Sequence, residues 1–122
     1  MNSREQALMA GTAAAQRKAR KVVILDLRAL SAVSDYFVVC SGNTPVQVRA
    51  IADHIMDYMR QEADLRPLRV EGYNEGRWVL LDYGDVIVHV FHEEERDYYG
   101  LERLWGDAEV LEVDAGEPVP YN

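Results

Sequence analysis

The stretch WVLLDYGDVIVHVF, residues 78–91, decides the fold because its pattern is that of a β-hairpin. Two runs rich in valine, leucine and isoleucine flank Tyr83-Gly84, and glycine readily adopts the positive φ that tight hairpin turns require. We therefore expect antiparallel strands at Arg77–Asp82 and Val86–Phe91. Because side chains alternate along a strand, the register of this pair decides which residues share a face.

With Asp82 opposite Asp85, the two faces of the predicted hairpin differ in character. One face is aliphatic and expected to be core: Val79, Leu81, Val86, Val88 and Val90. The other face carries Trp78, Leu80, Ile87 and His89, with Asp82 and Asp85 at the tip. An apolar centre with a carboxylate rim matches a protein interface. A covering helix is the alternative, because a mixed sheet often has helices on both faces.

The other predicted elements extend outward from the hairpin. Near-continuous apolar runs indicate central strands at Lys21–Leu27 and Tyr36–Cys40, and a further strand is expected at Leu68–Glu71. Helical patterns cover three segments: Arg4–Arg20, the residues from Pro45 onward, and Glu93–Trp105. The order α-β-β-α-β-β-β-α predicts a single α/β domain in which helices flank a mixed five-stranded sheet.

Local signals predict how the helices begin and which way they face. Ser3 and Gln6 fit a capping box, and Thr44 before Pro45 fits an N-cap ahead of a proline. In the last helix, Tyr99 lies outside the expected buried stripe. That stripe consists of residues at three- and four-residue steps: Tyr98, Leu101, Leu104 and Trp105.

Length and charge narrow the class of partner. The 122 residues, 48% of them hydrophobic, suit one domain. We divide the chain into a helical extension (1–20), the α/β domain (21–108) and an acidic, mobile tail (109–122). Residues 1–28 hold six Lys/Arg against two Asp/Glu, whereas residues 93–122 hold two against ten. The net charge of −8 opposes direct nucleic-acid binding and favours a basic protein surface as the partner of the acidic end.

The single cysteine and two of the histidines indicate neither a disulfide nor a metal site. Cys40 has no second cysteine to pair with and lies in an apolar strand, which is typical of a buried, inert thiol in a reducing cytosol. No apolar run approaches the roughly 20 residues that span a bilayer. His89 and His92 are separated by an odd step along a strand, so they are expected on opposite faces rather than around one metal ion.

An enzyme is the alternative reading of the polar residues. Asp82 and Asp85 could hold magnesium near a nucleotide at Ser41-Gly42, where a helix begins. Carboxylates at a hairpin tip are more typical of solvated turns, and turn and cap chemistry explains a serine–glycine pair at this position. The sequence therefore does not predict a catalytic residue.

Two blocks of sequence resemble the Iojap, or ribosomal silencing factor, family. The first is DYFVVCSG at residues 35–42, followed by Gln47 and AIAD at 50–53. The second comprises EG at 71–72, WVLLD at 78–82, GDVIVHVF at 84–91, and then Arg96, Tyr99, Leu101-Glu102 and Leu104-Trp105. Together the blocks cover about residues 21–108.

The resemblance implies a fold related to nucleotidyltransferases, without their phosphate-binding and metal-carboxylate pattern. It implies binding to protein fourteen of the large ribosomal subunit, and the chain is expected to be cytoplasmic and to need no cofactor. This basic protein lies beside an intersubunit bridge, so its occlusion would block subunit joining and repress translation when nutrients are short. Family members often form homodimers when free. An assembly factor for the large subunit remains the alternative.

The resemblance also assigns residues to the partner-contact region. Trp78 and Tyr99 match the family's aromatic contacts. Other motif positions nearby are Asp82, Asp85, Arg96 and Trp105. With the remaining residues of the second hairpin face, the predicted binding set is Trp78, Leu80, Asp82, Asp85, Ile87, His89, Arg96, Tyr99 and Trp105.

Overall fold

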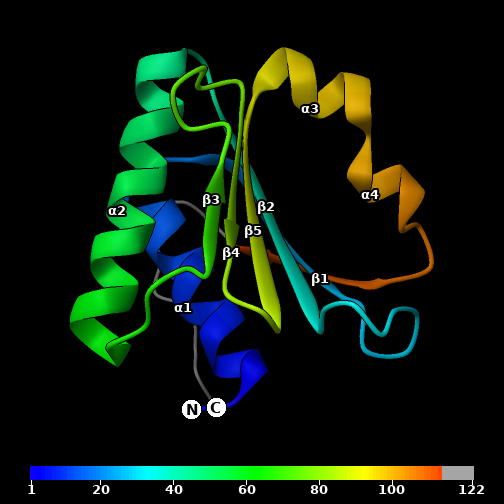
Figure 1. Cartoon of the computed structure of the whole chain (residues 1–122). Helices are drawn as coiled ribbons and strands as arrows, with labels where there is room; N and C mark the ends of the chain where they lie inside the picture. The colour runs from blue at the N-terminus through cyan, green and yellow to red at the C-terminus, as the bar shows by residue number, and fades with distance from the viewer. Residues whose placement is uncertain (114–122) are drawn as a thin grey trace.

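A six-stranded mixed sheet runs through the residues that the computed structural model describes, 1–113 (Figure 1). The strands are β1 (Arg20–Asp26), β2 (Tyr36–Gly42), β3 (Arg69–Glu71), β4 (Trp78–Asp82), β5 (Val86–His92) and β6 (Glu109–Val113). The helices are α1 (Ser3–Gln16), α2 (Pro45–Ala63), α3 (Glu93–Tyr99) and α4 (Leu101–Leu104). The strand order is β3-β4-β5-β2-β1-β6, in which only β2 and β5 pair in parallel.

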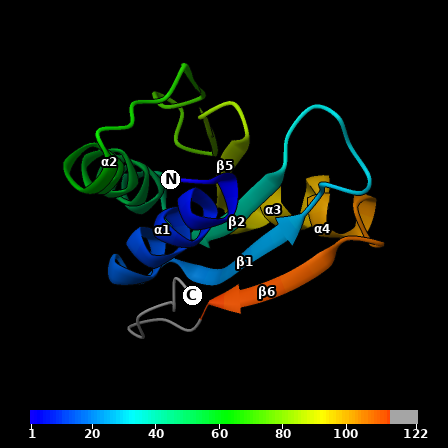
Figure 2. The ribbon, with the colours of Figure 1, turned by 90° about the horizontal axis from the view of Figure 1, so that it is seen from below.

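Helices lie on both sides of the sheet (Figure 1, Figure 2). α1 and α2 lie together against one face, and α3 and α4 lie on the other. The first face carries the predicted aliphatic core, and these residues are fully buried: Val79, Leu81, Val86, Val88 and Val90. The predicted single α/β domain with a mixed sheet is therefore confirmed. Among residues 1–113, no helix is long and apolar enough to cross a membrane.

The sheet has six strands, not the five predicted, because β6 falls in the expected acidic tail (109–122). β6 pairs antiparallel with β1, with Leu111 opposite Ile24 (Figure 2). Only Val113 of β6 is buried, at 8% exposure. An edge strand with so little buried surface tolerates charged residues, so its sequence lacks the apolar run of a central strand. The rest of the expected tail, 114–122, lies outside the described residues.

The hairpin register differs from the predicted one by two residues. Asp82 pairs with Ile87 rather than Asp85, and the backbone N–H of Tyr83 donates to the Val86 carbonyl at 2.9 Å. The turn residues are therefore Gly84-Asp85, with Gly84 at φ 89°. A shift of two residues preserves the alternation of side chains, so the predicted faces are correct although the predicted pairs are wrong.

The helix expected as an extension over residues 1–20 belongs to the core. Alanines of α1 are fully buried at four positions: Ala7, Ala10, Ala13 and Ala14. The capping box uses Asn2 and Glu5 instead of the predicted Ser3 and Gln6, with the Glu5 N–H donating to Asn2 Oδ1 at 2.8 Å. Ser3 Oγ donates instead to the Asp35 carboxylate at 2.7 Å, which ties the start of α1 to the segment before β2.

α2 begins as predicted. The Gln47 N–H donates to Thr44 Oγ1 at 3.1 Å, and Pro45 occupies the first helical turn. The expected face of α2 is fully buried at Val48 and Ile51. The N-cap and the apolar spacing therefore predict this helix correctly.

The last predicted helix, Glu93–Trp105, is broken in two. Gly100 adopts φ 58° between α3 and α4, a left-handed conformation that glycine accommodates without a Cβ clash. Because the chain turns at Gly100, α3 and α4 do not share one continuous face as a single helix would. Tyr98 and Leu104, predicted to be buried, are 80% and 72% exposed, so that part of the predicted stripe is wrong.

Candidate functional site

The second face of the sheet is only partly covered by α3 and α4. Trp105 packs edge to face on Phe37, with ring centroids 6.1 Å apart, as part of a cluster that is centred on β1 and β2 and also includes Phe91 of β5. On β4 and β5, Trp78, Leu80 and Ile87 keep part of their surface in solvent. Both expectations for this face therefore hold in part: helices cover one half, and the half built from the hairpin remains accessible.

Tyr99, the last residue of α3, extends the accessible half. Its side chain is 49% exposed and its ring centroid lies 4.6 Å from that of Trp78. On another side, the Trp78 ring packs against the buried Phe91 at 4.8 Å. We call Trp78, Leu80, Ile87 and Tyr99 the Trp78 surface. The two predicted aromatic contacts thus meet, although they come from different elements.

His89 lies on the same strand face but is buried, with 3% of its surface exposed. The Trp78 indole N–H donates to His89 Nδ1 at 3.1 Å. Burial lowers the pKa of His89 to about 4, because the charged imidazolium would lose its hydration. His89 is therefore neutral near pH 7 and supports the surface from within instead of forming part of it.

The two carboxylates at the hairpin tip have different roles. Asp82 accepts the backbone N–H of Gly84 at 2.8 Å and forms an ion pair with Arg69 at 3.3 Å. Asp85 is exposed, and its backbone carbonyl accepts the N–H of Asp35 at 2.9 Å. Asp82 is thus committed to the turn and to β3, whereas the Asp85 side chain is exposed in the turn, two residues before Ile87.

Arg96, predicted as a contact residue, is an internal support of α3 with 6% exposure. Its guanidinium donates to the backbone carbonyls of Arg20 and Lys21, at 3.1 and 2.7 Å. It also donates to Ser41 Oγ at 3.1 Å and pairs with Glu102 at 2.9 Å. Because α3 is held against β1 and β2 by these bonds, Arg96 positions the Trp78 surface but lies too deep to contact a partner directly.

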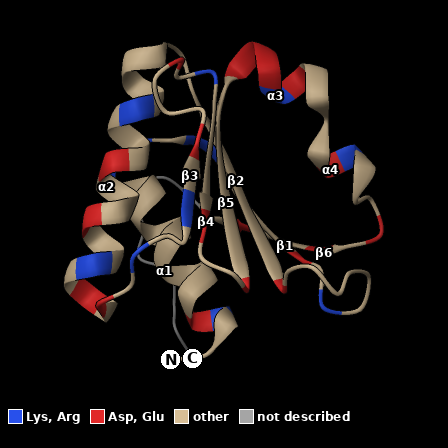
Figure 3. Ribbon diagram, in the orientation of Figure 1, with Lys and Arg blue, Asp and Glu red and all other residues tan. Residues whose placement is uncertain are grey.

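The outer side of α3 carries a second accessible feature. Glu94, Glu95, Tyr98 and Tyr99 line a hollow of about 370 Å³, which we call the α3 hollow. The two tyrosine rings meet edge to face at 5.1 Å. Figure 3 shows that acidic residues dominate the first turn of α3. Sequence reasoning missed this hollow, because the helical spacing had assigned Tyr98 to the buried stripe.

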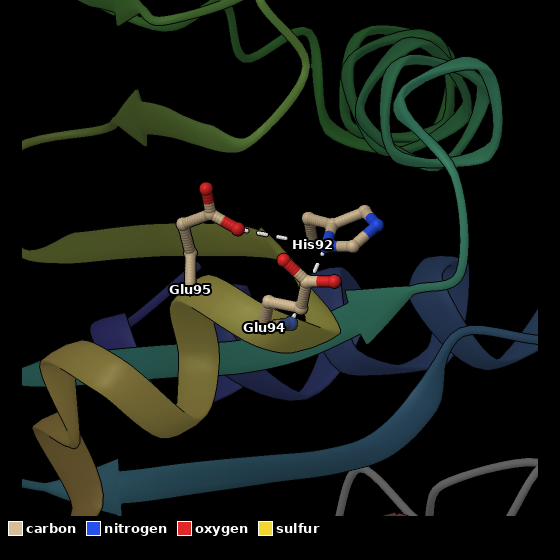
Figure 4. A group of neighbouring side chains, drawn as sticks. All are labelled: His92, Glu94 and Glu95. Atoms are coloured by element: carbon tan, nitrogen blue, oxygen red, sulfur yellow. Dashed lines mark hydrogen bonds and ion pairs between the residues drawn. The ribbon is translucent and has the colours of Figure 1, made fainter.

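His92, Glu94 and Glu95 bring three possible metal ligands within 4.8 Å of one another (Figure 4). Each already has a partner. The Glu94 N–H donates to His92 Nδ1 at 3.3 Å, which caps α3, and both glutamates form ion pairs with Arg77. The Arg77 guanidinium holds the pKa of Glu95 below its usual range. A helix cap and ion pairs therefore account for this arrangement.

The residues of the alternative enzyme site are not brought together. β2 and β5 run parallel, so the hairpin tip with Asp82 and Asp85 lies beside the start of β2. Ser41-Gly42 lies at the other end of β2, roughly 20 Å away at ~3.3 Å per residue. One magnesium-bound nucleotide cannot bridge phosphate donors and carboxylates at that separation.

Cys40 is fully buried in the middle of the sheet, as predicted. Burial raises the pKa of its thiol to about 12, since the thiolate would be desolvated. The thiol is therefore unreactive near neutral pH.

Comparison with known proteins identifies similar chains. A family model described as "Ribosomal silencing factor during starvation" matches residues 1–120. The Ribosomal silencing factor RsfS of Halalkalibacterium halodurans is 46% identical over 114 residues, covering 93% of this chain and 97% of that one. A crystal structure from Chromobacterium violaceum superposes with a TM-score of 0.83 at 34% identity, covering 97% of this chain and 98% of that one. A more distant relative, the mouse protein "Mitochondrial assembly of ribosomal large subunit protein 1", is 27% identical over 92 residues, 74% of this chain and 40% of that one.

Proposed function

Because the chain belongs to the ribosomal silencing factor family, we propose that it represses translation by docking on the large ribosomal subunit and blocking the small subunit. The direct partner is protein fourteen of the large subunit, a basic protein beside an intersubunit bridge. No catalytic step and no cofactor take part. The repressor acts in the cytoplasm when nutrients are limited.

The contact between Trp78 and Tyr99 carries this proposal. Partly exposed aromatic rings, already packed against a buried core, make strong anchors because little side-chain freedom is lost on binding. Leu80 and Ile87 extend the apolar centre, and Asp85 supplies a polar rim. The composition of this surface is that of the centre of a protein interface.

The α3 hollow fits a cationic side chain of a basic partner. Glu94 pairs with Arg77 at 3.2 Å but is largely exposed, and the rings of Tyr98 and Tyr99 that line the hollow offer a favourable quadrupole to a guanidinium or ammonium group. Charge complementarity of this kind speeds encounter and selects the partner's orientation. The hollow adjoins the Trp78 surface through Tyr99, so one basic protein surface could engage both.

The first test is cosedimentation of the purified chain with separated ribosomal subunits. We expect the wild type to bind large subunits selectively. Trp78→Ala and Tyr99→Ala should weaken binding while the fold survives, with Trp78→Ala costing at least ~2 kcal/mol as a central anchor. Val46→Ala is the matched control, because Val46 is 69% exposed on α2, across the sheet from the Trp78 surface. Failure of the wild type to bind either subunit would reject the proposal.

The blocking step needs a separate measurement. Light scattering during subunit association should show fewer joined ribosomes as the chain is added, and the folded Trp78→Ala variant should not have this effect. Binding to the large subunit without inhibition of joining would leave docking intact and contradict repression by occlusion.

Assembly of the large subunit is the second candidate, favoured by the name of the mouse relative. Depletion of the chain from growing cells separates the two roles. Immature large particles would indicate assembly, whereas normal particles with excess joined ribosomes under starvation would indicate repression.

We further propose that the free chain forms a homodimer. If pairing covers the Trp78 surface, dimerisation and docking compete, and apparent affinity for the subunit falls as the protein concentration rises. Sedimentation velocity together with docking at several concentrations tests this, and concentration-independent docking by a dimer would contradict the competition.

A further inference from the structure

We infer that His89 is the positioning residue for Trp78: its Nδ1 accepts the indole N–H and sets the ring orientation that docking requires. This inference rests on the proposed function of the Trp78 surface. It changes the role of His89 from a contact residue to an internal support, because only 3% of its surface is exposed.

The geometry around His89 allows few orientations of its ring. Its centroid lies 4.5 Å from that of Phe37, in an edge-to-face arrangement, and 6.1 Å from that of Phe91, nearly parallel. With the imidazole held in this way, Nδ1 presents its lone pair to Trp78 Nε1 at 3.1 Å. Because the His89 ring is fixed in the core, the hydrogen bond also restricts the orientation of the Trp78 ring at the surface.

The hydrogen bond also determines the tautomer of His89. Nδ1 must be the acceptor because an indole nitrogen can only donate, so Nε2 carries the proton of the neutral ring. Nε2 is buried and has no hydrogen-bond partner among the described residues. Retaining a buried donor without a partner costs free energy, so packing alone favours an apolar side chain at this position. Orientation of Trp78 is a role that an apolar residue could not fill.

Without this bond, the indole would be held by ring packing alone. Loss of the hydrogen bond removes one of the interactions that favour the observed χ1 and χ2 rotamers, so other rotamers become more populated despite the contacts with Phe91 and Tyr99. In those rotamers the Trp78 face leaves its contact with Tyr99. The fraction of molecules ready to dock would fall, and the apparent affinity would fall in proportion.

The variants His89→Leu and His89→Asn test this role. Leucine fills part of the space without an acceptor, whereas asparagine can place Oδ1 near the position of Nδ1. We expect His89→Leu to move the Trp78 indole N–H resonance toward the solvent-exposed value and to weaken docking about tenfold. His89→Asn should restore both in part. Trp105, the only other tryptophan, supplies an internal reference signal.

The possible results separate the positioning role of His89 from the proposed docking function. A folded His89→Leu variant that keeps the Trp78 resonance, or that docks as the wild type does, would overturn the positioning role. If His89→Leu does not fold, the ¹⁵N spectrum of the wild-type imidazole decides: a protonated Nε2 supports the role and a protonated Nδ1 overturns it. A wild type that binds no ribosomal subunit rejects the proposed function instead.

Discussion

The residues predicted for the binding set separate into two layers. Trp78 and Tyr99 reach the surface, and His89 and Arg96 lie beneath it with 3% and 6% exposure. The buried pair supports the exposed pair, His89 through a hydrogen bond to Trp78 and Arg96 by holding α3 in place. Truncating a member of either layer would weaken docking, so binding data alone cannot assign the layers and stability must be measured alongside.

His89 makes the fold sensitive to acid. Its pKa is lowered to about 4 from 6.5, so as the pH falls the unfolded chain takes up the proton first. The free energy of unfolding keeps its full value above about pH 6.5, and it falls progressively between pH 6.5 and pH 4 as the unfolded chain binds this proton. Urea unfolding at pH 7 and pH 5 should show a loss of roughly 2 kcal/mol attributable to this residue.

His89→Asn is the control for that measurement, because asparagine does not titrate. Both proteins keep His54, whose pKa burial also lowers, so the difference between the two proteins isolates His89. Parallel stability curves for the two proteins between pH 7 and pH 5 would contradict a buried neutral imidazole in the native state.

At the scale of elements, the turn between β3 and β4 places Trp78. Gly72 lies at φ 75°, and a Cβ there would clash with the backbone carbonyl oxygen of Trp78. Gly84, in the next turn, has φ 89°, but its Cβ would meet only Leu68 Cδ1 at 3.7 Å. The two glycines share the backbone conformation and differ in the space around them.

Gly72→Ala should therefore cost roughly 2–4 kcal/mol of unfolding free energy, against about 1 kcal/mol for Gly84→Ala. Chemical denaturation measures the unfolding free energy of both variants. Both substitutions carry the cost of positive φ, so the difference between their losses is the cost of the clash with the Trp78 backbone. Equal losses in the two variants would show that the turn moves to relieve the clash. Gly72→Ala should also shift the Trp78 indole resonance, because the carbonyl that the new Cβ displaces is that of Trp78.

At the scale of the whole molecule, the uneven charge should govern how fast the chain finds its partner. The net charge is −8, and α3 carries an acidic first turn beside the Trp78 surface. Raising the salt from about 0.05 M to about 0.5 M should slow association with large subunits about tenfold and change dissociation little. Stopped-flow mixing measures both rates.

Glu94→Gln removes one exposed charge of the α3 hollow and should reduce this salt dependence without unfolding the chain. Its side chain is 78% exposed, so the effect on stability should stay within about 0.5 kcal/mol. An association rate independent of salt in the wild type would contradict electrostatic steering and leave the aromatic anchors as the main determinant of docking.

The sequence alone was sufficient for features that depend on local periodicity. Alternation along residues 78–91 predicted both hairpin faces, because a two-residue error in register leaves side chains on the same side. The Thr44-Pro45 signal predicted the start of α2, since an N-cap acts within one turn. The resemblance to the family predicted aromatic contact residues on the hairpin and the last helix, and the Trp78 and Tyr99 rings do lie together.

Tertiary structure decided whatever depends on neighbours distant in sequence. β6 forms because β1 has an open edge to pair with, although its own sequence carries charges. The last helix is broken at Gly100 and Tyr98 is exposed on α3, whereas Arg96 is buried where it bonds to Arg20, Lys21 and Ser41. The periodicity of a sequence predicts which residues of one helix or strand share a face. Burial also depends on what the other elements place against that side, and only the assembled fold determines it.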